Sequence, residues 1–114
     1  MNEHISLLTR VQRLLDGFGS TAERLDQRSR EILLHIAEFE KQGEKLNMSD
    51  IRFNPQFGSP ATALGRLRFL LDEGWIRTSP HPEDRRVQLL AITPRAERQI
   101  VNTAAKMRQL LRDD

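Results

Sequence analysis

Apolar residues recur every three or four positions along two stretches in the first half of the chain. The first stretch, residues 5–18, predicts a helix with a broad apolar stripe that ends near Gly17 and Gly19. The second opens at residues 25–29, carries Ile32 and Ile36 on its apolar side, and ends around Gly43. The pattern therefore indicates two amphipathic helices before the middle of the chain.

A short helix and a turn are predicted next. Within residues 45–48, Leu46 has the character of a brief strand, and Ser49 with Asp50 supplies an N-cap for a short helix that holds Ile51 and Phe53. Residues 54–58 predict a turn, because an Asn-Pro pair and a glycine interrupt helices strongly.

A well-delimited helix follows the turn. Ser59 is its predicted N-cap, and Pro60 occupies the first position, where a missing N–H costs nothing. Gly74 provides a left-handed stop. The apolar stripe expected to face the core consists of Leu64, Leu67, Leu70 and Leu71.

Two short strands and a final helix complete the pattern. Residues 75–78 and 87–92 read as strands, separated by a polar, proline-containing loop at residues 79–84. Thr93 and Pro94 then cap a last helix, whose apolar side is formed by Ala96, Ile100, Ala104, Met107 and Leu111. We predict a mainly α-helical winged helix-turn-helix fold with a small β-hairpin, as a single domain over residues 1–114.

Composition narrows the functional classes. With 114 residues the chain suits one domain of ordinary size. The absence of cysteine excludes disulfides, thiol catalysis and cysteine-based zinc sites, and we expect no cofactor. No apolar run approaches the ~18 residues of a membrane span, and no signal-peptide pattern is present, so we expect a cytoplasmic protein.

Basic residues concentrate in the second half of the chain. Residues 1–50 hold 7 Lys or Arg against 9 Asp or Glu, whereas residues 51–114 hold 11 against 7. Arginine outnumbers lysine by 15 to 3, and its planar fork suits phosphates and guanine edges. A GC-rich genome would also produce an arginine excess, so this bias alone does not decide between the two explanations.

The helix that begins at Ser59 has the character of a recognition helix. Because its leucines face inward, the remaining residues share the outer surface. Hydroxyl groups there can bind phosphates or bases, alanines can pack on thymine methyl groups, and arginines can bind guanine or phosphate. The predicted DNA contacts on this helix are Ser59, Ala61, Thr62, Ala63, Arg66 and Arg68. Alternatively, Arg66 and Arg68 form only a solvated face, but the basic hairpin immediately downstream favours the DNA-binding interpretation.

The hairpin carries the second set of predicted contacts. In the run Asp84-Arg85-Arg86, the carboxylate can hold one guanidinium in a fixed pose that points into a narrow groove. His81 is placed to touch a phosphate. The alternative is that Glu83 and Asp84 simply neutralise the two arginines on a solvated loop.

Three segments resemble the MarR (multiple antibiotic resistance regulator) family of winged-helix transcription factors. They are the helix exit Leu70–Ile76, the Asp-x-Arg wing at residues 84–86, and the Leu-Thr-x-x-Gly-like start at residues 91–96. The resemblance covers roughly residues 26–105 and implies that Arg86 enters a minor groove with Asp84 as its orienting partner. One departure is Arg52, which stands where the family has a small core residue.

The resemblance also bears on assembly and control. Family members bind palindromic DNA as homodimers, and many respond to phenolic or lipophilic effectors. Apolar stripes on the terminal helices, residues 2–18 and 94–112, suit a homodimer interface. The chain is compatible with control by a small molecule and equally with a DNA-binding module that has none.

We therefore expect a regulator, acting as a repressor, that binds double-stranded DNA in a sequence-specific manner. A winged-helix protein-interaction module is one alternative, and a plasmid or phage replication or partition protein is another. The three histidines lack metal-ligand spacing, and the sequence contains no nucleophile–base arrangement, phosphate loop or paired carboxylates, so we predict no metal site, no catalytic residues and no enzyme. Glu38 and Glu40 read as a solvated helix face.

Overall fold

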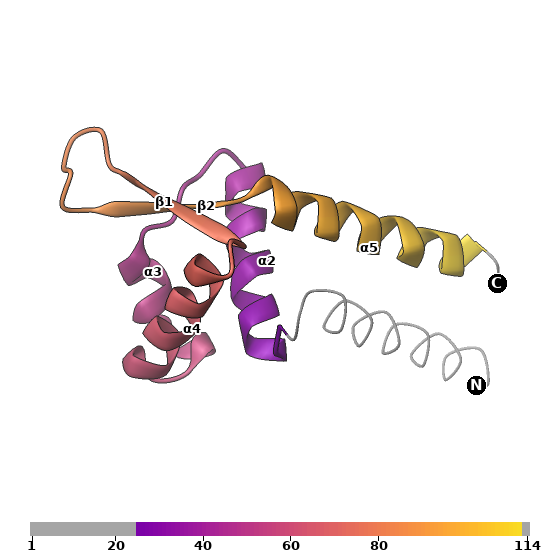
Figure 1. Cartoon of the computed structure of the whole chain (residues 1–114), viewed down its shortest axis with the longest axis horizontal. Coiled ribbons are helices and arrows are strands. Elements are labelled where there is room, and N and C mark those ends of the chain that lie inside the picture. The colour runs from indigo at the N-terminus through magenta and orange to yellow at the C-terminus, as the bar shows by residue number, and fades with distance from the viewer. Residues whose placement is uncertain (1–24, 113–114) are drawn as a thin grey trace. The chain divides into compact units, whose positions relative to one another are not determined.

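The computed structural model describes residues 25–112, and their order of elements is the predicted one. These are α2 (Gln27–Lys41), α3 (Met48–Arg52), the 3-10 helix η1 (Pro55–Phe57), α4 (Pro60–Asp72), β1 (Ile76–Pro80), β2 (Gln88–Ile92) and α5 (Pro94–Arg112). The helix predicted at residues 5–18 lies outside the described residues. The chain divides into two compact units, one of which, Gln27–Ala96, contains the winged helix (Figure 1).

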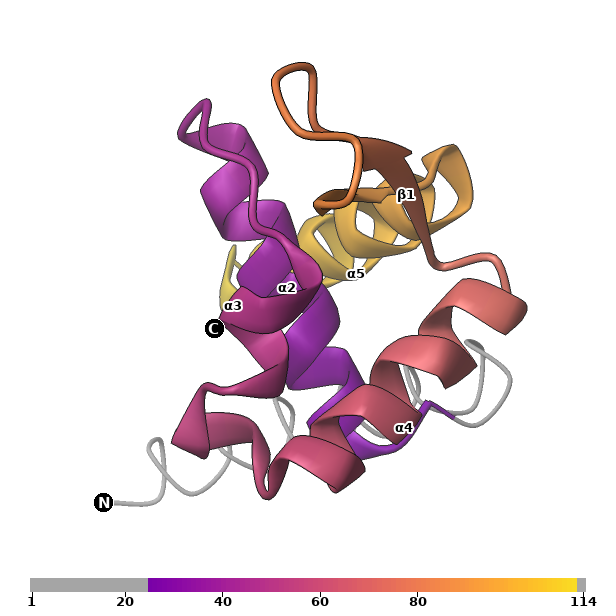
Figure 2. The same cartoon turned by 90° about the vertical axis from the view of Figure 1, so that its left-hand side faces the viewer.

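The core of the Gln27–Ala96 unit lies where α2, α3 and α4 meet beneath the hairpin (Figures 1 and 2). The buried positions follow the periods expected of a helix, three and four residues apart. Near-complete burial is shared by Ile32, Leu33, Ile36, Ile51, Phe57, Ala63, Leu67, Leu70, Trp75, Ile76 and Leu90. The hairpin loop extends from this cluster, away from α4 in both views.

The short helix α3 begins earlier than predicted. Its N-cap is Asn47, whose side chain accepts a hydrogen bond from the Asp50 N–H at 2.9 Å, while the Asp50 carboxylate accepts one from the Asn47 N–H at 2.8 Å. This reciprocal capping box places Ser49 inside the helix, so the predicted Ser49 cap is wrong. Phe53, expected in this helix, is its C-cap and is 60% exposed.

The hairpin is a two-stranded antiparallel sheet in which Ile76 pairs with Ile92 and Pro80 with Gln88. The edge of β2 that faces away from β1 is also covered, because the Leu90 N–H donates to the Leu46 carbonyl at 2.7 Å. The brief pairing predicted at Leu46 is thus found as this hydrogen bond and an isolated bridge between Asn47 and Leu89, without a full strand.

Glu40 completes that edge of β2. Its carboxylate accepts a hydrogen bond from the Ile92 N–H at 3.1 Å in a partly buried setting. The side chain therefore satisfies a strand donor that would otherwise lack a partner strand. The prediction that Glu40 is merely solvated is wrong, because its partner lies 52 residues away in sequence; Glu38 is exposed as expected.

The junction between α4, the hairpin and α5 is tightly bonded. Gly74 takes the predicted left-handed conformation with φ of 76°. The Thr93 hydroxyl donates to the Gly74 carbonyl at 2.7 Å and accepts from the Ala96 N–H at 3.3 Å, which confirms Thr93 as the cap of α5. The Arg95 guanidinium lies 4.0 Å from the centroid of the Trp75 ring and donates to the Glu73 carbonyl, so one side chain joins the exit of α4 to the start of α5.

The later part of α5 keeps apolar surface uncovered. On the predicted stripe, Ile100, Ala104 and Met107 are half-buried, and Leu111 is 53% exposed. Val101 nearby is 58% exposed. Among residues 25–112, no helix combines the length and the apolar character that crossing a membrane requires.

Candidate nucleic-acid interface

The first turn of α4 is built as predicted. Ser59 has extended backbone angles, with φ of −66° and ψ of 156°, and its hydroxyl oxygen accepts a hydrogen bond from the Thr62 N–H at 3.2 Å. The same hydroxyl donates to Thr62 Oγ1 at 2.9 Å. Thr62 Oγ1 accepts this bond, so the Thr62 hydroxyl hydrogen takes no part in it. Both residues are exposed, so this end of the helix can donate to an approaching anion.

The outer face of α4 differs from the prediction at one position. Ala63, expected to touch bases, has 0% exposure and packs in the core with Leu67 and Leu70. The buried line runs 63, 67, 70, and Leu64, which was expected to start it, is only half-buried. Because Ala63 is fully buried, it cannot contact DNA, while Ala61 and Thr62 stay exposed.

The two arginines of α4 have different environments. Arg66 is half-buried and is engaged in an interaction of its own. Arg68 is exposed and lies seven residues after Ala61, which places both on one face of the helix. Arg68 is thus the more accessible cation of this element.

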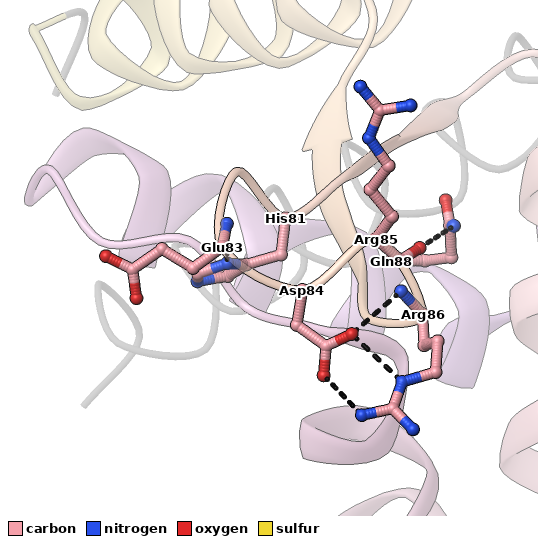
Figure 3. A network of polar contacts seen from close by, with 6 residues as sticks. All are labelled: His81, Glu83, Asp84, Arg85, Arg86 and Gln88. Atoms are coloured by element: carbon pink, nitrogen blue, oxygen red, sulfur yellow. Dashed lines mark hydrogen bonds and ion pairs between the residues drawn. The ribbon is translucent and has the colours of Figure 1, made fainter.

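The wing loop holds one guanidinium in a defined pose (Figure 3). Arg86 Nε donates to Asp84 Oδ1 at 3.1 Å, and a terminal nitrogen of the same guanidinium donates to Asp84 Oδ2 at 3.3 Å. The Arg86 backbone N–H also donates to Oδ1, at 3.1 Å. The side chain of Arg86 is nevertheless 92% exposed, so the group is oriented without being covered.

The electrostatics of Asp84 support the same arrangement. The side-chain hydrogen bond from Arg86, and then the backbone hydrogen bond from Arg86, lower the pKa of the Asp84 carboxyl, and the charge of His81 adds to the effect. The carboxylate therefore stays ionised throughout the physiological range, and the pair with Arg86 persists there.

Backbone bonds fix the rest of the wing loop. The His81 N–H donates to the Val87 carbonyl at 2.9 Å, and His81 Nδ1 accepts from the Glu83 N–H at 3.0 Å. The Arg85 carbonyl accepts from the Gln88 side chain at 3.4 Å. In Figure 3 the side chains of Arg85 and Arg86 point in opposite directions, so the neighbouring arginines do not present one joint surface.

The predicted contacts fall into two clusters on the same side of the winged-helix unit. The first turns of α4 carry one cluster, and the wing loop carries His81, Asp84, Arg85 and Arg86. Both elements lie toward the left of Figure 1, the side that faces the viewer in Figure 2. The backbones of α4 and of the wing loop therefore lie on one side of the unit.

Residues that sequence reasoning missed support the start of α4. Arg28 Nη1 donates to the Gln56 carbonyl at 2.7 Å, and the Asn54 side chain accepts from the Gln56 N–H at 3.0 Å. Gly58 then turns the chain with φ of 92°. The Asn-Pro pair signalled the turn, but nothing near Arg28 in the sequence pointed to a partner 28 residues away. Within residues 25–112, no group of three or more His, Cys, Asp or Glu side chains could hold a metal ion.

Comparisons with known proteins define the fold. No protein-family model and no curated protein sequence matches the chain. Among solved structures, an S. aureus MepR–DNA complex superposes with a TM-score of 0.75 at 17% identity, over 97% of this chain and 80% of that one. A mutant MarR from E. coli complexed with operator DNA gives 0.62 at 16%, over 96% and 77%.

A third similar structure is the adhesin competence repressor AdcR from Streptococcus pyogenes. It gives a TM-score of 0.58 at 15% identity, over 93% of this chain and 76% of that one. Agreement of this extent with MarR-type structures confirms the predicted winged helix-turn-helix fold.

Proposed function

We propose that this chain, which has the MarR-type winged-helix fold, is a regulator that binds double-stranded DNA in a sequence-specific manner and represses transcription. The start of α4 would enter the major groove, and Arg86 would enter the adjacent minor groove. The observation that carries the proposal is the Arg86 guanidinium, which donates two hydrogen bonds to Asp84 while the side chain is 92% exposed; the Arg86 backbone N–H donates a third to the same carboxylate. A cation that is oriented but uncovered suits an external anionic partner.

The two elements match two different features of a duplex. The N-terminal end of α4 offers hydroxyls at Ser59 and Thr62, and its positive dipole end attracts phosphate. Arginine inserted in a narrow minor groove reads its enhanced negative potential, most strongly in A·T-rich sequence. Recognition helix and wing together would span neighbouring grooves.

Three of the similar structures bear on the partner and on the direction of control. MepR and MarR were solved with DNA, and the AdcR structure is described as that of a repressor. These observations support DNA as the partner and repression as the outcome. A protein-interaction module with the same fold would keep the shape but lack selective binding to a duplex.

Selection of bound fragments from random duplex DNA tests the proposal. We expect enrichment of a defined sequence, with affinity that falls linearly on a logarithmic scale as salt rises, because each neutralised phosphate releases a counterion. The control is single-stranded DNA of the same sequence. No enriched sequence, together with binding that ignores salt, would refute the proposal and favour the protein-interaction alternative.

We further propose that the protein is a homodimer that uses its terminal helices, residues 2–18 and 94–112. The support in the described residues is the apolar stripe of α5, where Met107 is only half-buried and Leu111 is 53% exposed. Closed two-fold pairing would bury such a face and would place two recognition helices about one helical turn apart on DNA.

Sedimentation equilibrium at micromolar concentration is the measurement for this assembly. We expect twice the chain mass for the native protein, and a shift toward the monomer for Leu111→Asp, because a charge on the stripe that the dimer would bury opposes association. The matched control is Arg112→Asp, which places the same carboxylate at the neighbouring exposed position. A native protein that sediments as a monomer would contradict the dimer.

A further inference from the structure

Gly65 occupies an unusual position in α4. It is the sixth residue of a continuous helix that runs from Pro60 to Asp72, and it is exposed. Its backbone is helical, unlike that of Gly43, Gly58 and Gly74, whose positive φ angles suit the turns they form. No backbone geometry therefore demands a glycine here.

Packing does not demand a glycine at this position either. A Cβ built on Gly65 would meet no heavy atom of the described protein within 4 Å. Alanine would fit this space, and it stabilises helix interiors relative to glycine, which loses more backbone entropy on folding. The folding of the chain by itself thus disfavours the residue that is present.

The neighbours of Gly65 on the helix surface suggest a reason why this position has no side chain. Ala61 lies one turn before it and Arg68 one turn after it, on the same exposed face. The surface therefore changes from a small side chain to bare backbone and then to a cation. Bare backbone allows a partner to approach a helix more closely than any other residue permits.

We propose that Gly65 is the point of closest approach between α4 and the base edges of the major groove, and that it is a specificity-determining residue. This inference rests on the proposed DNA-binding function. The backbone of α4 at Gly65 would lie against the base edges. Arg68, on the same face of the helix, would bind a phosphate or a guanine. A methyl group at Gly65 would hold the helix away from the groove floor.

The test compares native protein with Gly65→Ala and Gly65→Gln on two duplexes. One duplex carries the sequence recovered from the random pool, and the other is an unrelated sequence of equal length. For Gly65→Ala we expect a higher midpoint of urea unfolding but an affinity for the selected duplex about tenfold weaker or more, the size of effect that one lost base contact has. Gly65→Gln should lose more affinity than Gly65→Ala.

Affinity for the unrelated duplex should stay unchanged in both variants, because non-specific binding rests on phosphate contacts and not on groove insertion.

Two results separate the two proposals. If native protein selects no duplex, the DNA-binding function fails, and the inference about Gly65 fails with it. If native protein selects a duplex and Gly65→Ala binds it equally well, the function stands and the inference about Gly65 alone is overturned.

Discussion

Replacing Arg86 with alanine should weaken binding to the selected duplex by about ten- to a hundredfold. A hydrogen bond to a charged group contributes ~1.5–3 kcal/mol, which corresponds to roughly that range of affinity. The loss should be largest for sites with A·T-rich flanks, since their narrow minor groove attracts arginine most strongly. A gel shift on duplexes that differ only in these flanks measures both effects.

Arg85→Ala is the matched control for this variant. It removes the same charge from the adjacent position, and its side chain is also exposed but points the other way from Arg86. We expect only the smaller, flank-independent loss that a distant cation causes. Equal losses in the two variants would show that the wing contributes general charge and that the fixed pose of Arg86 has no role.

Asp84→Asn separates orientation from neutralisation. If Asp84 only cancels charge, removing its carboxylate raises affinity for any duplex. If it orients Arg86, affinity for A·T-flanked sites falls despite the gain of one positive charge, and this is the result we expect. Because the pKa of Asp84 is lowered, the native pair loses its charge only when pH falls below the ordinary range of a carboxyl. DNA binding should therefore show no transition from Asp84 between pH 5 and 8, a range that lies above ~4.

Local signals in the sequence carried most of the correct predictions. The caps at Ser59 and Thr93 and the stop at Gly74 each depend on residues within three or four positions. The Asp84–Arg86 pair spans two residues, so its spacing alone made the contact foreseeable. Motifs of this kind determine the ends of helices and the shape of the wing.

Two of the errors arose where tertiary contacts decide, and a third, the N-cap of α3, is local. Nothing local distinguishes Ala63 from Leu64 as the start of the buried line, because the choice depends on how α4 rotates against α2 and α3. Glu40 has the sequence context of an ordinary surface acid, but its carboxylate accepts from the Ile92 N–H of β2, 52 residues later in the chain. Asn47 and Ser49 are both good caps, and the capping box with Asp50 selects Asn47.

Phe57 is the clearest case of a residue whose importance the local pattern hid. It lies in a segment that reads as a turn, yet it has 0% exposure. Its ring meets the His35 ring of α2 edge to face, with centroids 5.2 Å apart and an interplanar angle of 73°. It also directly precedes Gly58 and the Ser59 cap, so it anchors the start of α4 to the core.

Phe57→Ala should accordingly lower the free energy of unfolding by about 3–5 kcal/mol, because a large buried ring is replaced by a cavity. The free energy of unfolding of a domain this size is typically ~5–15 kcal/mol, so the variant should lose a large share of it. Urea unfolding followed by circular dichroism gives the free energy, and fluorescence of Trp75, the one tryptophan of the chain, gives an independent signal from the core.

Phe53→Ala is the control that the chain itself provides. It makes the identical substitution four residues earlier, at a ring that is 60% exposed and contacts the Arg52 guanidinium at 5.1 Å. We expect a change within about 0.5 kcal/mol, as for other surface substitutions. If Phe53→Ala proved as destabilising as Phe57→Ala, the placement of these two rings would be wrong. The anchor of α4 would then have to lie elsewhere, and with it the physical reason why Ser59 and Thr62 face outward.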